Sequence, residues 1–70
     1  MTLTDYLVAY KISAAELGRR LNISRAQIHR YLTGRRRITA ERAVQIEGVT
    51  DGKVTRHELR PDLFRKADAA

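Results

Sequence analysis

The chain has 70 residues and a net charge of +6, contains no cysteine, and is 43% hydrophobic. This length fits one small domain, and the lack of cysteine excludes a disulfide framework and a thiolate metal site. No apolar run approaches the roughly 18–20 residues of a membrane-spanning helix, and no signal peptide is visible, so we expect a cytoplasmic protein.

The positive charge is concentrated in the middle of the chain. Residues 11–42 contain nine Lys and Arg side chains but only two acids, Glu16 and Glu41, whereas residues 43–70 contain five side chains of each sign. This pattern predicts a polyanionic partner, with nucleic acid preferred over an anionic membrane. The alternative is a solvated surface that only keeps the protein soluble.

Five segments share one local pattern that is typical of helix starts. In each, a Ser or Thr can accept a hydrogen bond from the first free N–H groups of a helix. An apolar residue directly precedes this Ser or Thr. In four of them an acid or Gln three residues later predicts a reciprocal hydrogen bond, which completes a capping box. The predicted cap residues are Thr2, Ser13, Ser24, Thr39 and Thr55.

These starts predict helices near residues 3–10, 14–21, 25–32, 40–47 and 56–60. We expect Gly48 to end the fourth helix, Asp51-Gly52 to form a turn, and Pro61 to close the fifth helix. Residues 66–70 should fray, so the domain is assigned to residues 1–65. The expected fold class is all-α, a compact bundle of four to five short helices.

The second and third helices are separated by only three residues, Asn22-Ile23-Ser24. A joint this short, with small residues at the crossing, predicts a tight and steep helix pair. Gly18 should let the third helix approach closely, and Asn22 can adopt the left-handed conformation that the turn needs. The side chains expected to pack between the two helices are Leu17, Leu21, Ile28, Tyr31 and Leu32.

The segment AAELGRRLNISRAQIHRYLTGRRR resembles the helix-turn-helix of the lambda-repressor-like class. The following ITAERAVQIEGVTDGKVTRHELRPDLF resembles phage Cro-like and YdaS-type regulators, so the resemblance covers about residues 3–64. It implies a sequence-specific transcriptional regulator, a repressor of phage or prophage origin, that binds a double-stranded DNA operator as a homodimer. Three residues depart from the class: Gly18 replaces Ala, Asn22 replaces Gly, and Ala14 replaces a Gln that often contacts phosphate.

By this resemblance the third helix enters the major groove and presents four residues to base edges. Arg25 and Arg30 can each bond two acceptors on guanine, and Ala26 is small enough to meet a thymine methyl group. His29 can donate to a base or a phosphate. The alternatives are that both arginines bind only phosphates and that His29 is a solvated surface residue.

A second set of residues is expected to contact phosphates. The arginine run that follows Gly34 suits phosphate oxygens, unless it is only a solvated basic loop. Ser24 has an alternative role as a helix cap. Gln27 is interpreted as its capping-box partner, with a base contact as the alternative. The predicted phosphate-contacting residues are Ser24, Thr33, Arg35, Arg36, Arg37, Arg19 and Lys11.

Catalysis, RNA binding and membrane binding fit the sequence less well. His29 and His57 lie on different elements, and no catalytic set, metal spacing or phosphate loop is present, so we expect neither an enzyme nor a cofactor. RNA binding lacks an aromatic stacking platform. A membrane-surface helix would need apolar faces that the core already requires.

The C-terminal apolar residues leave two interpretations open. If the protein is a DNA-bound homodimer, Leu63 and Phe64 are predicted to cross to the second copy, while Leu59 covers the core. If it is an antitoxin-like module that binds a toxin as well as DNA, Leu59, Leu63 and Phe64 would form the contact surface.

Overall fold

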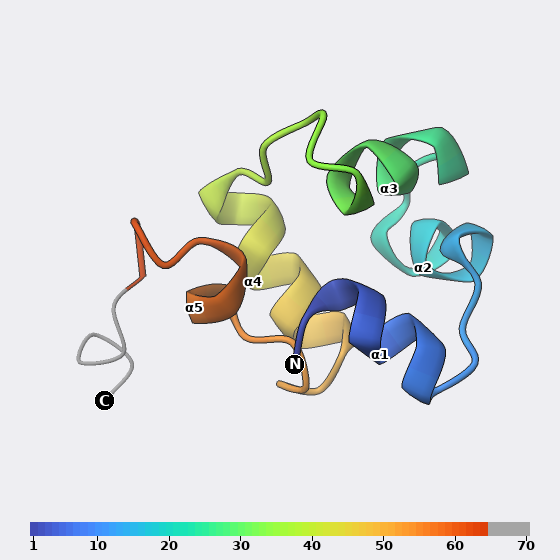
Figure 1. Ribbon diagram of the computed structural model, residues 1–70, viewed down its shortest axis with the longest axis horizontal. Helices are drawn as coiled ribbons and strands as arrows, with labels where there is room; N and C mark the ends of the chain where they lie inside the picture. The colour runs from blue at the N-terminus through green and yellow to red at the C-terminus, as the bar shows by residue number, and fades with distance from the viewer. Residues whose placement is uncertain (65–70) are drawn as a thin grey trace.

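The computed structural model describes residues 1–64, and this part of the chain consists of helices and loops. α2 packs on α3 and on α4, while α5 packs on α4 (Figure 1). The predicted all-α fold is therefore confirmed, and the predicted tail at residues 66–70 lies outside the described residues. The helices are α1 (Leu3–Ala9), α2 (Ala14–Leu21), α3 (Arg25–Leu32), α4 (Ala40–Val49) and α5 (Arg56–Leu59).

Every helix begins after the Ser or Thr that the sequence predicts as its cap. The hydroxyl oxygen accepts a hydrogen bond from the backbone N–H three residues later, at 3.1 to 3.2 Å in all five cases. Each bond satisfies one of the N–H groups that a helix leaves without a partner at its start. The five predicted helix starts are thus confirmed.

The reciprocal half of the predicted capping box was wrong for Glu16 and Gln27. The carboxylate of Glu16 instead accepts a hydrogen bond from Arg19 Nε at 2.9 Å and pairs with Arg20 at 3.4 Å. Gln27 Nε2 donates to the hydroxyl of Tyr31 at 3.3 Å. These partners lie one helical turn away on the same face, and a guanidinium is a stronger partner for a carboxylate than a backbone N–H.

The fourth helix continues through Gly48, so the prediction that Gly48 ends it was wrong. Thr50 caps the helix instead, and its hydroxyl donates to the carbonyl of Ile46 at 2.8 Å. Because the hydroxyl of Thr50 bonds a carbonyl of the last turn, the chain reverses only after Thr50, at Asp51 (φ 53°) and Gly52 (φ 77°). The predicted turn at these two residues is confirmed.

The ends of α1 and α5 each fall one residue before the predicted bound. Pro61 has the expected effect on α5. Arg60 precedes it and has left the helical region, with φ at −139°, as the residue before a proline tends to do.

The hydrophobic core lies where the first four helices meet. Leu17 and Ile28 are fully buried at its centre, as predicted, and Tyr31 and Leu32 pack against it while half-buried. Leu59 also packs on this core, as expected, whereas Leu63 is 47% exposed. The buried apolar side chains are Leu3, Tyr6, Leu17, Leu21, Ile28, Ala43, Ile46 and Val54.

The joint between α2 and α3 has the geometry that its residues predict. Asn22 adopts the left-handed conformation, with φ at 60° and ψ at 42°. The N–H of Ile23 donates to the carbonyl of Gly18 at 2.8 Å, which closes a Schellman-type end on α2. A Cβ atom on Gly18 would lie only 2.6 Å from the carbonyl oxygen of Ile23. A glycine at residue 18 therefore lets the incoming chain lie directly against α2.

We expect Gly18→Ala to lower the free energy of unfolding by about 1–3 kcal/mol, because the new methyl group overlaps a backbone oxygen that moves only if the joint opens. Urea denaturation followed by helical circular dichroism measures this change.

Gly48→Ala is the matched control. It makes the same change within a helix, where an added Cβ meets nothing within 4 Å. This variant should be more stable by about 0.5–1 kcal/mol, because Ala is the better helix former. Equal shifts in the two variants would contradict the close approach at Gly18.

Candidate nucleic-acid interface

The outer face of α3 presents the residues predicted to contact bases. Arg25, Ala26, His29 and Arg30 are all exposed, while Ile28 on the opposite side is fully buried. The four exposed positions follow the helical repeat, so their side chains emerge on one side of α3. We call these four residues the outer face. It carries two guanidinium groups, one imidazole and the small methyl group of Ala26.

Two hydroxyl groups at the ends of α3 are already used within the protein. The hydroxyl oxygen of Ser24 accepts from the N–H of Gln27 at 3.2 Å, and the hydroxyl of Thr33 donates to the carbonyl of His29 at 2.9 Å. Ser24 can still donate its hydroxyl proton to a phosphate oxygen. For Thr33 to do so, its hydrogen bond to the carbonyl of His29 would have to break.

The three arginines after α3 lie on a short exposed loop, residues 34–37, which we call the arginine loop. Gly34 begins it with a φ of 75°, a value that glycine adopts without strain. The N–H of Arg36 then donates to the carbonyl of Arg30 at 3.2 Å. The arginine loop is therefore held against the last turn of α3, next to the outer face.

Arg60 anchors the other end of the arginine loop, a role that the sequence reasoning missed. Its Nη1 donates to the carbonyl of Ile38 at 2.7 Å, and its Nε and Nη2 donate to the two carboxylate oxygens of Asp62 at 2.9 and 2.6 Å. The hydrogen bonds from Arg60, together with the positive charge of Arg37, lower the pKa of Asp62 to about 2. No local sequence pattern predicts the contact between Arg60 and Ile38, because the two residues are 22 positions apart in the chain.

The two predicted phosphate contacts that precede the joint, Lys11 and Arg19, differ in their hydrogen-bond partners within the protein. Lys11 is exposed in a left-handed conformation, with φ at 54°. Arg19 is exposed but bonds Glu16, and this hydrogen bond lowers the pKa of the Glu16 carboxyl. Arg42, which was not predicted to contact phosphate, is the one half-buried basic residue between residues 11 and 42, and it donates to the carbonyl of Leu21 at 3.4 Å. Arg42 therefore connects α4 to the end of α2.

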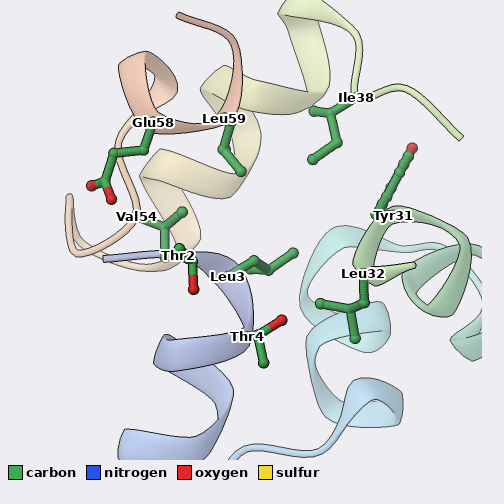
Figure 2. A pocket seen from close by; sticks show the side chains of 9 residues that line it. All are labelled: Thr2, Leu3, Thr4, Tyr31, Leu32, Ile38, Val54, Glu58 and Leu59. Carbon is green, nitrogen blue, oxygen red and sulfur yellow. The ribbon is translucent and has the colours of Figure 1, made fainter. Parts of the chain in front are cut away.

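A separate apolar pocket of about 220 Å³ lies beside α5. Figure 2 shows Leu3, Ile38 and Leu59 pointing toward one another from three different segments. Tyr31 lines this pocket from α3, and its side chain also borders the hollow between the arginine loop and Arg60. The polar residues that line the pocket are Thr2, Thr4, Tyr31 and Glu58.

The part of the chain that the structure describes contains no cluster of three His, Cys, Asp or Glu side chains placed to hold a metal ion. None of its helices has both the length and the apolar character needed to cross a membrane. The two histidines lie on different helices, His29 on α3 and His57 on α5.

One protein-family model, described as bacterial toxin YdaS, matches residues 10–68. The matched span includes the joint, α3 and the arginine loop, and it confirms the resemblance to YdaS-type regulators. The match indicates a small regulator or a toxin–antitoxin-related protein. No curated protein and no solved structure matches the chain.

Proposed function

The chain belongs to the bacterial YdaS family, and we propose that it is a sequence-specific, double-stranded DNA-binding transcriptional regulator. The observation that carries this proposal is the outer face of α3, where two exposed arginines lie beside an anchored arginine loop. We further propose a repressor of phage or prophage origin, which acts in the cytoplasm by occupying nucleoid DNA. Such a protein works by binding alone, without catalysis or a cofactor.

In this proposal α3 enters the major groove. Arg25 and Arg30 each donate two hydrogen bonds to a guanine, and His29 donates to a base or a neighbouring phosphate. Ala26 leaves room for a thymine methyl group. The residues that project from α3 thus offer donors and a small apolar surface, which together discriminate between base pairs.

The phosphate contacts surround the outer face. Arg35, Arg36 and Arg37 follow α3 directly, and their guanidiniums suit the geometry of phosphate oxygens. Lys11 and Arg19 would contribute further positive charge from the α1–α2 side. Such contacts set the register of the protein on the duplex and supply affinity that does not depend on base sequence.

We also propose that two copies bind one palindromic operator. The eight residues of α3 cover only a few base pairs, too few to select one genomic site. A two-fold pair would place its two α3 helices about 34–36 Å apart, one turn of DNA. Leu63 is the best candidate for the contact because it is 47% exposed, whereas the ring of Phe64 lies 5.6 Å from the guanidinium carbon of Arg56.

A second candidate function is supported by the family description, which names a bacterial toxin. The protein would then form part of a toxin–antitoxin pair and bind a protein partner through Leu59, Leu63 and Phe64. Leu59 lines the apolar pocket beside α5, and Leu63 is exposed nearby in the chain. Titration with duplex DNA at two salt concentrations tests the first function: binding that weakens as salt rises supports phosphate contacts, whereas an absent or salt-insensitive interaction favours the protein-binding role.

Two arginine variants test how the proposed interface divides its work. We expect Arg30→Ala to weaken binding to the preferred operator by about 1–3 kcal/mol and to relax the preference at one position of each half-site. Arg36→Ala should instead weaken binding to all duplexes by similar factors and reduce the log–log salt slope by about one. Fluorescence anisotropy with specific and random duplexes over a salt series measures both effects.

Each variant serves as the control for the other, because both remove one exposed positive charge beside the last turn of α3. If Arg30→Ala loses equal affinity for specific and random DNA, Arg30 contacts a phosphate and not a base. An unchanged salt slope for Arg36→Ala would remove Arg36 from the backbone contacts.

The proposed dimer predicts two protomers on each palindromic duplex in sedimentation velocity runs. Leu63→Ala should reduce cooperative binding while the helical circular dichroism stays unchanged, because this side chain is exposed in the single chain. Val8→Ala is the matched control, since Val8 is also exposed but lies on α1. One protomer per duplex, or an equal loss of cooperativity in both variants, would argue against a C-terminal dimer contact.

A further inference from the structure

Arg60 makes an unusually complete set of contacts for a residue just beyond a four-residue helix. Its side chain is only 13% exposed, and three of its N–H groups donate to oxygens at 2.6 to 2.9 Å. Asp62 accepts two of these hydrogen bonds with its two carboxylate oxygens. This fork geometry fixes the plane of the guanidinium as well as its position.

The third hydrogen bond from Arg60 reaches the arginine loop. Nη1 donates to the carbonyl of Ile38, the residue that follows Arg37. At the start of the arginine loop, the N–H of Gly34 donates to the carbonyl of Tyr31 at 3.3 Å, and the N–H of Arg36 donates to the carbonyl of Arg30 at 3.2 Å. The three loop arginines therefore lie within a segment that backbone hydrogen bonds tie to α3 and the side chain of Arg60 ties to the C-terminal part of the domain.

We propose that Arg60 is a positioning residue for DNA binding: it holds the arginine loop in the conformation that presents Arg35, Arg36 and Arg37 to the phosphate backbone. This inference rests on the proposed DNA-binding function. Asp62 contributes by orienting the guanidinium of Arg60 toward Ile38. A segment that is already ordered loses less conformational entropy when it binds, so the anchor increases affinity without touching DNA.

The geometry favours this indirect role over a direct contact between Arg60 and DNA. The side chain of Arg60 is largely covered, whereas the three loop arginines are exposed. The carboxylate of Asp62, which is 56% exposed, lies on the same guanidinium and would repel an approaching phosphate. The low pKa of Asp62 keeps this carboxylate charged at neutral pH.

The first part of the test uses the free protein and the variant Arg60→Met. Amide hydrogen exchange at Arg36 reports the hydrogen bond that holds the loop against α3. We expect this amide to exchange about tenfold faster in Arg60→Met, because loss of the anchor lets the loop open locally. Measurements are made well below the melting temperature of each variant, so that global unfolding does not contribute.

Arg56→Met is the matched control. Arg56 lies on α5, pairs with the carboxylate of Glu47 at 2.9 Å, and carries the same charge, but the structure gives it no hydrogen bond to the arginine loop. It should leave exchange at Arg36 unchanged. Unchanged exchange in Arg60→Met, or equal acceleration in both variants, would overturn the positioning role whether or not the protein binds DNA.

The second part measures affinity for a random duplex over a salt series. Arg60→Met should lower the affinity and reduce the log–log salt slope by about one to two, since the loop arginines no longer engage fully. In a background with Arg35, Arg36 and Arg37 all changed to Ala, Arg60→Met should have no further effect, as expected for a residue that acts only through the loop.

The two parts fail in different ways. If Arg60→Met keeps its full effect in the triple-alanine background, Arg60 contacts DNA itself and the positioning role is wrong. If the wild-type protein binds no duplex but amide exchange at Arg36 is faster in Arg60→Met, Arg60 does anchor the loop. The proposed DNA-binding function is then wrong, and so is the role of Arg60 in DNA binding.

Discussion

The structure depends most on the close approach of the chain to Gly18. The carbonyl oxygen of Ile23 lies where a side chain at residue 18 would begin, and the left-handed backbone of Asn22 directs the chain back along α2. With the joint this tight, Ile28 is fully buried against the core. The same rotation of α3 that buries Ile28 turns Arg25 and Arg30 outward, so the packing of the joint also aims the basic outer face.

The distribution of acids keeps that face positive. Residues 25–37 contain no Asp or Glu. Several of the carboxylates elsewhere pair with basic groups outside this segment: Glu16 with Arg19 and Arg20 on α2, Glu47 with Arg56, and Asp62 with Arg60. Arg25, Arg30 and the arginine loop therefore keep their positive charge for a polyanion, although the carboxylate of Asp62 also lies near Arg37.

How far the sequence predicts this protein depends on how local each feature is. The five caps and the turn at Asn22 were predictable because each rests on the conformational preference of one or two residues. The end of α4 was not, because Thr50 caps the helix in place of Gly48. The partners of Glu16 and Gln27 were also missed, because side chains one turn away competed with the backbone N–H.

For the candidate site, the resemblance to the helix-turn-helix class placed Arg25, Ala26, His29 and Arg30 on the outer side of the third helix, and all four are exposed in the structure. Periodicity within one helix could not find Arg60, whose contact with Ile38 exists only after α5 has packed on α4. The role of each outer-face residue toward a base or a phosphate stays a prediction, since it depends on a partner and not on the fold.

Nuclear magnetic resonance mapping of the labelled protein during titration with duplex DNA tests the DNA-binding function most directly. If α3 enters the major groove, the largest shift changes fall on the outer face of α3 and on the arginine loop, with little change at Val8 on α1. Changes concentrated instead around Leu3 and Leu59, at the apolar pocket beside α5, would contradict it and favour a protein-binding role.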